Sequence, residues 1–162
     1  MRARRTKAPD SKSARARAPR GARRHKSLHK PAALRRFAKG FRWEGVTLEP
    51  YKLEGGRAGE FRAATRQVLV GNSGEQAAFH LRYFELAPGG FTSYERHRHC
   101  HVVIGVRGRG MVRIGAQRQL LRPMDIAYIA PGEAHQLSAE GHSPFGFFCI
   151  VNARRDRPRP AL

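Results

Sequence analysis

Short runs in which apolar and polar residues alternate dominate the chain from about residue 60 onward. Alternation with a period of two, rich in β-branched and aromatic residues, is typical of strands that bury one face. No helical period is sustained over ten residues between positions 60 and 153, so the predicted fold class is all-β, a sandwich or a jelly-roll barrel. The pattern predicts eight strands, over residues 66–72, 79–86, 101–106, 111–115, 118–121, 125–130, 135–138 and 145–152.

Glycine and proline punctuate the segments between these strands. The sequence "APGG", which ends at Gly90, predicts a turn, as do "RGRG" at 107–110 and "APGEA" at 130–134. The sequence "GAQ" at 115–117 predicts a hairpin.

The first 40 residues differ from the rest in composition. They hold 15 Lys and Arg against one acid, Asp10, and so carry +14 of the net charge of +20. Few large apolar residues occur there, too few to offset the entropy lost on ordering. We therefore predict a disordered basic tail over 1–40, a folded domain over 41–157 and a C-terminal tail over 158–162.

Three interpretations of the basic tail stay open: a weak contact with the phosphate backbone of nucleic acid or another anionic surface, an Arg-rich organelle transit segment, and an extension without function. No apolar segment follows the basic start, and no run approaches the roughly 18 apolar residues of a membrane span, so neither a secretory signal nor membrane insertion is expected.

Cys100 and Cys149 are too few for a disulfide framework, which predicts a reducing, cytoplasmic location.

The stretch "YERHRHCHVVIGVRGRG", residues 94–110, places metal-capable side chains at every second position: Glu95, His97, His99 and His101. Side chains two apart share one face of a strand. At about 3.3 Å per residue, however, Glu95 and His101 of an extended strand lie roughly 20 Å apart, whereas a metal binds a histidine nitrogen at about 2.1 Å. Either the chain turns within this stretch, or only some of these residues bind one ion.

The spacing of this stretch resembles the first motif of the cupin superfamily, G-x(5)-H-x-H-x(3,4)-E-x(6)-G. Its positions fall on Gly89, Glu95, His97, His101 and Gly108. Every spacing fits, but Glu stands where the first His is usual and His stands where Glu is usual. The exchange keeps a set of two histidines and one carboxylate.

The second cupin motif, G-x(5)-P-x-G-x(2)-H-x(3)-N, is degenerate in this chain, because only Gly132 and His135 match it. The resemblance covers roughly residues 45–157 and is to small single-domain cupins of the type-2 conserved barrel. It implies a double-stranded β-helix of six to eight strands, with one ion held inside the barrel mouth.

The resemblance also implies a bend at residues 98–100 that brings His101 back beside His97. His99 is a further candidate ligand, for which ligation and an outer or surface position both stay open. Three imidazoles and a carboxylate suit a divalent transition metal, namely Fe, Mn, Ni, Co or Zn, and do not suit calcium or magnesium. The ligands that the resemblance implies are Glu95, His97, His101 and His135. The alternative is a polar barrel lining without a metal.

Cupins include dioxygenases, isomerases, decarboxylases and non-catalytic binding domains, so whether this chain is an enzyme stays open. The leading hypothesis is a metal-binding cupin that acts on a small organic molecule. Four arginines favour an anionic molecule or are solvated strand faces: Arg82, Arg107, Arg109 and Arg113. The alternatives are a non-catalytic ligand-binding or regulatory cupin whose tail contacts nucleic acid, and a metal-free structural cupin that forms a homodimer. No helix-turn-helix pattern supports specific DNA recognition.

Overall fold

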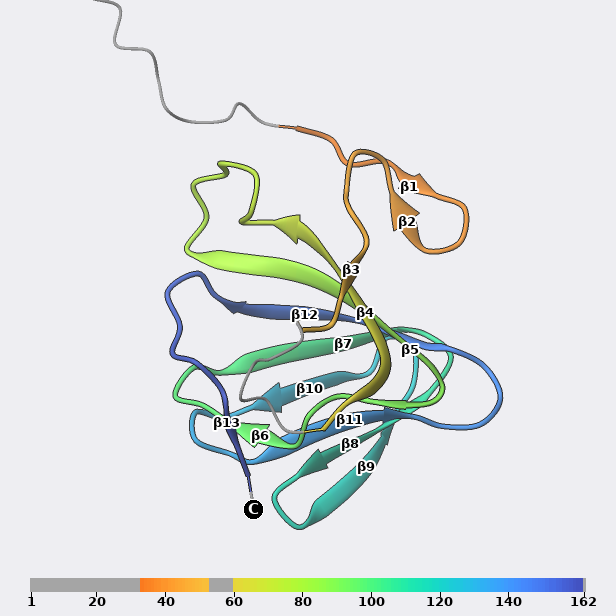
Figure 1. Ribbon diagram of the computed structural model, residues 1–162, viewed down its shortest axis with the longest axis vertical. Helices are drawn as coiled ribbons and strands as arrows, with labels where there is room; N and C mark the ends of the chain where they lie inside the picture. Colours follow the sequence, from red (N-terminus) through yellow and green to blue (C-terminus); the bar gives the residue numbers. More distant parts are fainter. Residues whose placement is uncertain (1–32, 53–59, 162) are drawn as a thin grey trace, which may run out of the picture.

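The computed structural model describes residues 33–52 and 60–161, and every regular element in them is a strand (Figure 1). The body of the fold consists of β4 (Arg62–Val70), β5 (Phe79–Phe91), β7 (His101–Arg107), β8 (Gly110–Ile114), β9 (Gln117–Leu121), β10 (Ile126–Ile129), β11 (His135–Ala139) and β12 (Phe145–Asn152). Five two-residue strands accompany them: β1 (Phe37–Ala38), β2 (Arg42–Trp43), β3 (Glu49–Pro50), β6 (Glu95–Arg96) and β13 (Arg159–Pro160). The eight predicted strands and the all-β class are confirmed.

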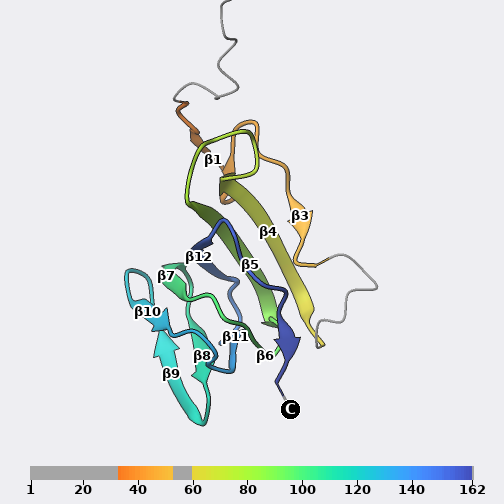
Figure 2. The ribbon, with the colours of Figure 1, turned by 90° about the vertical axis from the view of Figure 1, so that its left-hand side faces the viewer.

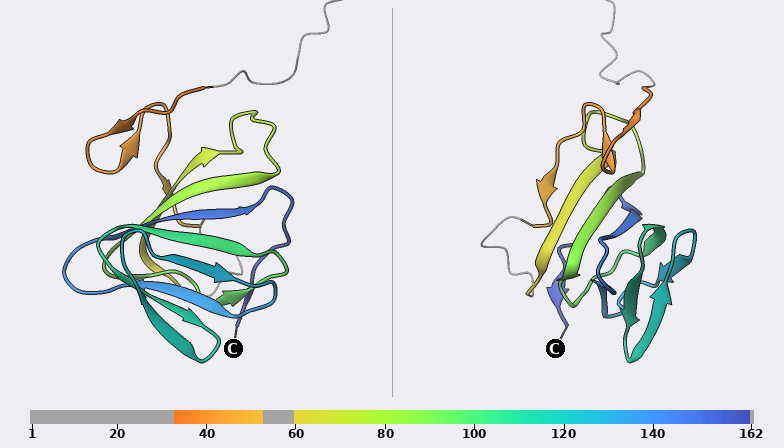
Figure 3. Two further views of the ribbon diagram at one scale, coloured as in Figure 1. Left: turned by 180° about the vertical axis from the view of Figure 1, so that it is seen from behind. Right: turned by 90° about the vertical axis from the view of Figure 1, so that its right-hand side faces the viewer.

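The strands form a barrel with two walls (Figures 2 and 3). One wall runs in the order β3-β4-β5-β12-β7-β10, and the other in the order β9-β8-β11-β6-β13, with every pair antiparallel. Strand β11 joins the walls, because it pairs with β8 and also with β5 through Ser138 and Phe91. This is the jelly-roll arrangement that the sequence predicts. In the part of the chain that the structure describes, no helix is long and apolar enough to cross a membrane.

The core lies between the two walls and follows the alternation of the strands. On β5 and β12, Phe84 and Phe147 face each other in register and their rings stack with centroids 5.4 Å apart. Cys149 lies two residues further along the same face and is 2 % exposed, as expected for a buried core thiol. Burial of such alternating apolar side chains is the main force that holds the barrel together.

Two glycines of the first cupin motif have conformations that other residues rarely adopt. Gly89 has φ of +71°, and the turn predicted at "APGG" is wrong, because β5 continues through it to Phe91 while its register with β4 shifts. Gly108 has φ of +63°, and a Cβ there would lie 2.2 Å from the carbonyl oxygen of Pro144. A side chain at Gly108 would therefore disrupt the turn that ends β7.

Order at both ends extends beyond the predicted domain. Residues 33–40 of the predicted tail carry β1, which pairs with β2, and the ring of Phe37 packs 5.3 Å from Trp43. The rest of the predicted tail, residues 1–32, lies outside the described residues. At the other end, the predicted C-terminal tail contributes β13, which pairs with β6 beside the metal-capable stretch. Figure 1 shows β13 and β6 side by side at this edge of the barrel.

Candidate metal centre

Three histidines converge inside the barrel: His97, His101 and His135. Their ring nitrogens lie within 4.8 Å of one another, and their ring centroids are 4.5 to 5.0 Å apart. They are 5 %, 8 % and 3 % exposed, respectively. His101 opens β7, His135 opens β11, and His97 follows β6, so three separate strands position them. Imidazoles this close can share one metal ion.

A bend in the chain makes this convergence feasible. Strand β6 ends at Arg96, the chain bends at Arg98 and His99, and it returns as β7 at His101. The bend lies within residues 98–100, where the cupin resemblance implies it. It removes the separation of roughly 20 Å that an extended strand would impose between the two ends of this stretch.

The hydrogen bonds of the imidazoles fix which nitrogen is available to an ion. The Nδ1–H of His97 donates to the carbonyl of His99 at 2.8 Å, and the Nδ1–H of His135 donates to the carbonyl of Glu133 at 2.9 Å. A carbonyl can only accept, so the proton is on Nδ1 and the lone pair is on Nε2. The Nε2 atoms of His97 and His101 are buried without a hydrogen-bond partner. A cation between them would satisfy both nitrogens, so the residues fit a metal.

Burial keeps these imidazoles neutral. It lowers the pKa of His97 to about 4, with a further decrease from the neighbouring His99 and His135. It also lowers the pKa of His101 and of His135 below the usual value near 6.5. Neutral imidazole is the form that binds metal, so the triad is ready for an ion at pH 7.

The metal-free protein is expected to lose stability as the pH falls from 6.5 to 4. Between pH 6.5 and pH 4, His97 is protonated in the unfolded chain but stays neutral in the folded protein, where its pKa is about 4. This uptake of a proton favours the unfolded state. Above pH 6.5 neither state is protonated there and the residue contributes nothing. The loss is on the order of 3 kcal/mol for His97. Urea unfolding of metal-free protein at pH 7 and pH 5 should show about 2 kcal/mol of this loss, since pH 5 lies above the folded pKa of about 4. The exposed His142 provides the control variant His142→Ala, and equal midpoints at both pH values would contradict the prediction.

Glu95 lies beside the triad but outside its cluster of ring nitrogens. It pairs in register with His135 across β6 and β11 and is 5 % exposed. Its Oε2 forms an ion pair with the ammonium of Lys52, which also donates to the hydroxyl of Ser93 at 2.8 Å. The carboxylate predicted as a ligand thus has a cationic partner that sequence reasoning missed.

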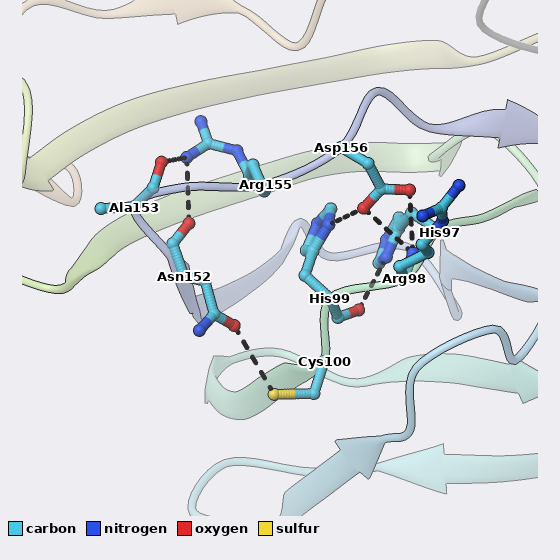
Figure 4. Close-up of polar contacts among 8 residues, drawn as sticks. All are labelled: His97, Arg98, His99, Cys100, Asn152, Ala153, Arg155 and Asp156. Atoms are coloured by element: carbon cyan, nitrogen blue, oxygen red, sulfur yellow. Dashed lines mark hydrogen bonds and ion pairs between the residues drawn. The ribbon is translucent and has the colours of Figure 1, made fainter.

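The ring of His99, which is buried, stacks on the ring of His97 in the triad. Its ring lies 3.6 Å from that of His97 with an interplanar angle of 6°, and its Nδ1 lies 2.9 Å from Oδ1 of Asp156 (Figure 4). The same carboxylate accepts from the backbone N–H of Arg98 at 2.9 and 3.0 Å, and this contact and His99 lower the pKa of Asp156. Asp156 therefore fastens the C-terminal segment to the bend. No local sequence pattern indicates this contact between residues 57 positions apart.

The triad opens into a cavity of about 1220 Å³. Of the four arginines considered from the sequence, Arg82 lines this cavity. Arg107 instead pairs with Glu85 at 2.9 Å, and Arg113 lies 4.0 Å over the ring of Tyr94. The apolar part of the lining comes from Tyr51, Phe84, Val103, Leu137 and Phe147. An apolar cavity with a few polar groups converging on it is typical of a small-molecule site.

An antiparallel jelly-roll barrel with histidines converging at its mouth defines a class of small β-barrel proteins with a candidate metal centre. The sequence profile of the cupin domain matches residues 82–151. A 1-methylthio-D-xylulose 5-phosphate methylsulfurylase from Rhodospirillum rubrum is 42% identical over 126 residues, which cover 78% of each chain. The chain belongs to the cupin family.

Two crystal structures agree with this assignment. A cupin-2 domain protein from Rhodospirillum rubrum is 40% identical, with a TM-score of 0.68 over 80% of this chain and 84% of its own. A cupin 2 conserved barrel domain protein from Rhodopseudomonas palustris is 35% identical, with a TM-score of 0.71 over 80% of this chain and 87% of its own. The similarity to each of them therefore spans most of both chains.

Proposed function

We propose that this protein is a metal-dependent cupin enzyme that acts on a small phosphorylated ketose carrying a methylthio group. The observation that carries the proposal is the 42% identity to the methylsulfurylase from Rhodospirillum rubrum over 78% of both chains. The site supports it, because three buried neutral histidines face a cavity large enough for a small organic molecule.

We further propose that His97, His101, His135 and Glu95 hold the ion, which is Fe, Mn, Ni, Co or Zn, with His99 as an outer contact or a further ligand. A bound metal would act as a Lewis acid that polarises the ketone oxygen next to the carbon bearing sulfur. The chain's own groups orient the substrate and exclude water: apolar side chains such as Phe84 and Leu137 line the cavity, and Lys52 holds a proton beside Glu95. Contact with nucleic acid through the tail, homodimer formation and a cytoplasmic location stay predictions.

The test combines metal analysis with an assay. We expect protein purified without added metal to contain close to one transition-metal ion per chain. We also expect it to transfer the methylthio group of 1-methylthio-D-xylulose 5-phosphate to an added thiol. The carbon–sulfur bond of the sugar breaks, the thiol becomes a mixed methyl disulfide, and its proton ends on the sugar carbon, which becomes a methyl group. The shift of the S-methyl singlet in proton NMR follows this transfer. His97→Ala protein is the matched control. A metal-loaded protein that leaves this compound unchanged would rule out the substrate, and a protein that binds no transition metal would rule out the mechanism.

A further inference from the structure

The cavity beside the triad has a strong excess of positive charge. Seven Lys and Arg side chains line it, against the two carboxylates Glu95 and Asp156. Both carboxylates are already engaged, Glu95 with Lys52 and Asp156 with the Arg98 N–H and His99. Few carboxylates are therefore left to balance the charge of the other Lys and Arg side chains in the lining. A cavity of this kind attracts an anionic ligand.

Arg82, on β5, is one of the half-buried cations of this lining. It lies on the same face of β5 as the core residues Phe84 and Leu86, so it points into the barrel. Its guanidinium sits 5.0 Å over the ring of Phe84, and its Nε is buried without a hydrogen-bond partner. Its one polar contact among the described residues is with the sulfur of Cys149, at 3.4 Å. A guanidinium group that packs on an aromatic ring and whose Nε has no acceptor can donate a hydrogen bond to a ligand.

Arg82 also lies close to the metal centre. The Cys149 sulfur that contacts Arg82 at 3.4 Å lies at the same distance from Nδ1 of His101. Only one sulfur atom therefore separates the guanidinium from the back of a triad imidazole. A ligand that reached both the triad and Arg82 would need to be no longer than a small sugar phosphate.

Arg155, in the C-terminal segment, lines the same cavity. Its Nη1 contacts the carbonyls of Asn152 and Ala153 at 3.3 and 3.4 Å (Figure 4), and His80 at 3.4 Å. No carboxylate pairs with it among the described residues. His80, which Arg155 contacts, lies two residues before Arg82 on the same face of β5, and both arginines line the cavity. Asp156, the next residue, fastens this segment in place.

Arg66 completes the group but is already neutralised. It lies on β4 in register with Phe84, and its guanidinium pairs with Glu49 at 2.8 Å. Among the described residues, Arg82 and Arg155 form no ion pair, as is also true of Arg98, Arg157 and Arg159 in the same lining. A phosphate monoester carries a charge between about −1.5 and −2 at pH 7, which two guanidinium groups match, and its oxygens fit their paired N–H donors.

We propose that Arg82 and Arg155 form the subsite for the phosphate group of the substrate. This proposal rests on the proposed function for the identity of the substrate, and it assigns two positioning residues that hold the ketose while its carbonyl end faces the histidines. Arg66, held by Glu49, borders the subsite and contributes less. The phosphate thereby fixes which end of the molecule enters the metal centre.

Binding of D-xylulose 5-phosphate and of inorganic phosphate to the full-length protein, measured by calorimetry, tests the subsite. Arg82→Gln and Arg155→Gln should each weaken both ligands by about tenfold to a hundredfold, the range for a lost charged hydrogen bond. Metal content should stay unchanged in both. The charge-matched control Arg118→Gln, exposed on β9 and away from the cavity, should bind like the wild type. Unchanged affinity in Arg155→Gln, or a loss in Arg157→Gln that the two subsite variants do not show, would overturn the assignment.

Two further readouts separate this proposal from others. Arg82→Lys keeps the charge but not the planar fork, and should bind phosphate with intermediate affinity, whereas a purely structural role would lower its thermal midpoint instead. If the methylthio compound is converted with unchanged KM by both Gln variants, the subsite fails and the proposed function stands. If that compound is not converted, but D-xylulose 5-phosphate still binds in a manner that depends on Arg82 and Arg155, the proposed function fails and the subsite stands.

Discussion

Replacing His135 with alanine is expected to remove nearly all metal from the purified protein while the barrel stays folded. His135 is 3 % exposed, and its ring lies 4.8 Å from that of His97 and 5.0 Å from that of His101. Its Nδ1–H is held by the Glu133 carbonyl, so the variant loses an oriented ligand. Loss of an outer partner of a ligand already costs about 10- to 100-fold in metal affinity, and loss of the ligand itself should exceed that.

The chain provides a matched control for this experiment. His142 is exposed in the loop before β12 and lies outside the triad, so His142→Ala should keep a full complement of metal. Elemental analysis measures the metal, and far-ultraviolet circular dichroism should report an unchanged β fold. The apolar strands carry the core, as the buried Phe145, Phe147 and Val151 on β12 illustrate. Full metal occupancy in His135→Ala protein would remove His135 from the site and disconnect the two cupin motifs.

The parts of the fold that follow from sequence are those with local patterns. Each of the eight longer strands has enough alternating residues for its period to be visible. The geometry of an extended strand left two alternatives, a turn or partial binding, and the cupin resemblance implied the bend at residues 98–100 that the structure shows. The two-residue strands were not predicted, because strands such as β6 and β13 are defined by pairing with distant residues: Glu95–Arg96 pairs with Arg159–Pro160, and Glu95 also pairs with His135. The turn predicted at Gly89 was wrong because a glycine with positive φ suits a bulge within a continuous strand as well as a turn.

The partners of the site residues could not be predicted for a different reason. Lys52 is 43 positions from Glu95, and Asp156 is 57 positions from His99, so no spacing rule connects them. Arg82 did carry a signal, because it alternates with Phe84 and therefore had to share the face of a core residue. The sequence alone does not say which face of the strand is turned to the barrel interior, and without that direction Arg82 could equally lie on the solvent-exposed face.

Glu95→Gln is expected to weaken metal binding more than His99→Ala does. Glu95 supplies a formal negative charge beside three neutral imidazoles, in a cavity where positive charge predominates, and a neutral amide cannot offset the charge of a divalent ion. His99 instead has its Nδ1 engaged by Asp156 and its ring stacked on His97, so its loss should cost less. Titration of metal-free variants with one transition metal against a coloured chelator measures both affinities.

The variant Lys52→Met tests whether the Glu95 carboxylate binds the metal ion or only forms the ion pair with Lys52. The ammonium of Lys52 occupies Oε2 of Glu95 and competes with a cation for that carboxylate. If Glu95 binds the ion, removing the ammonium should tighten metal binding, and the double variant Lys52→Met with Glu95→Gln should be as weak as Glu95→Gln alone. If Glu95 only anchors Lys52, Lys52→Met should leave the metal affinity unchanged. Loss of metal from His99→Ala, with full retention by Glu95→Gln, would show that the centre is an H-x-H-x-H cluster and that the carboxylate lies outside it.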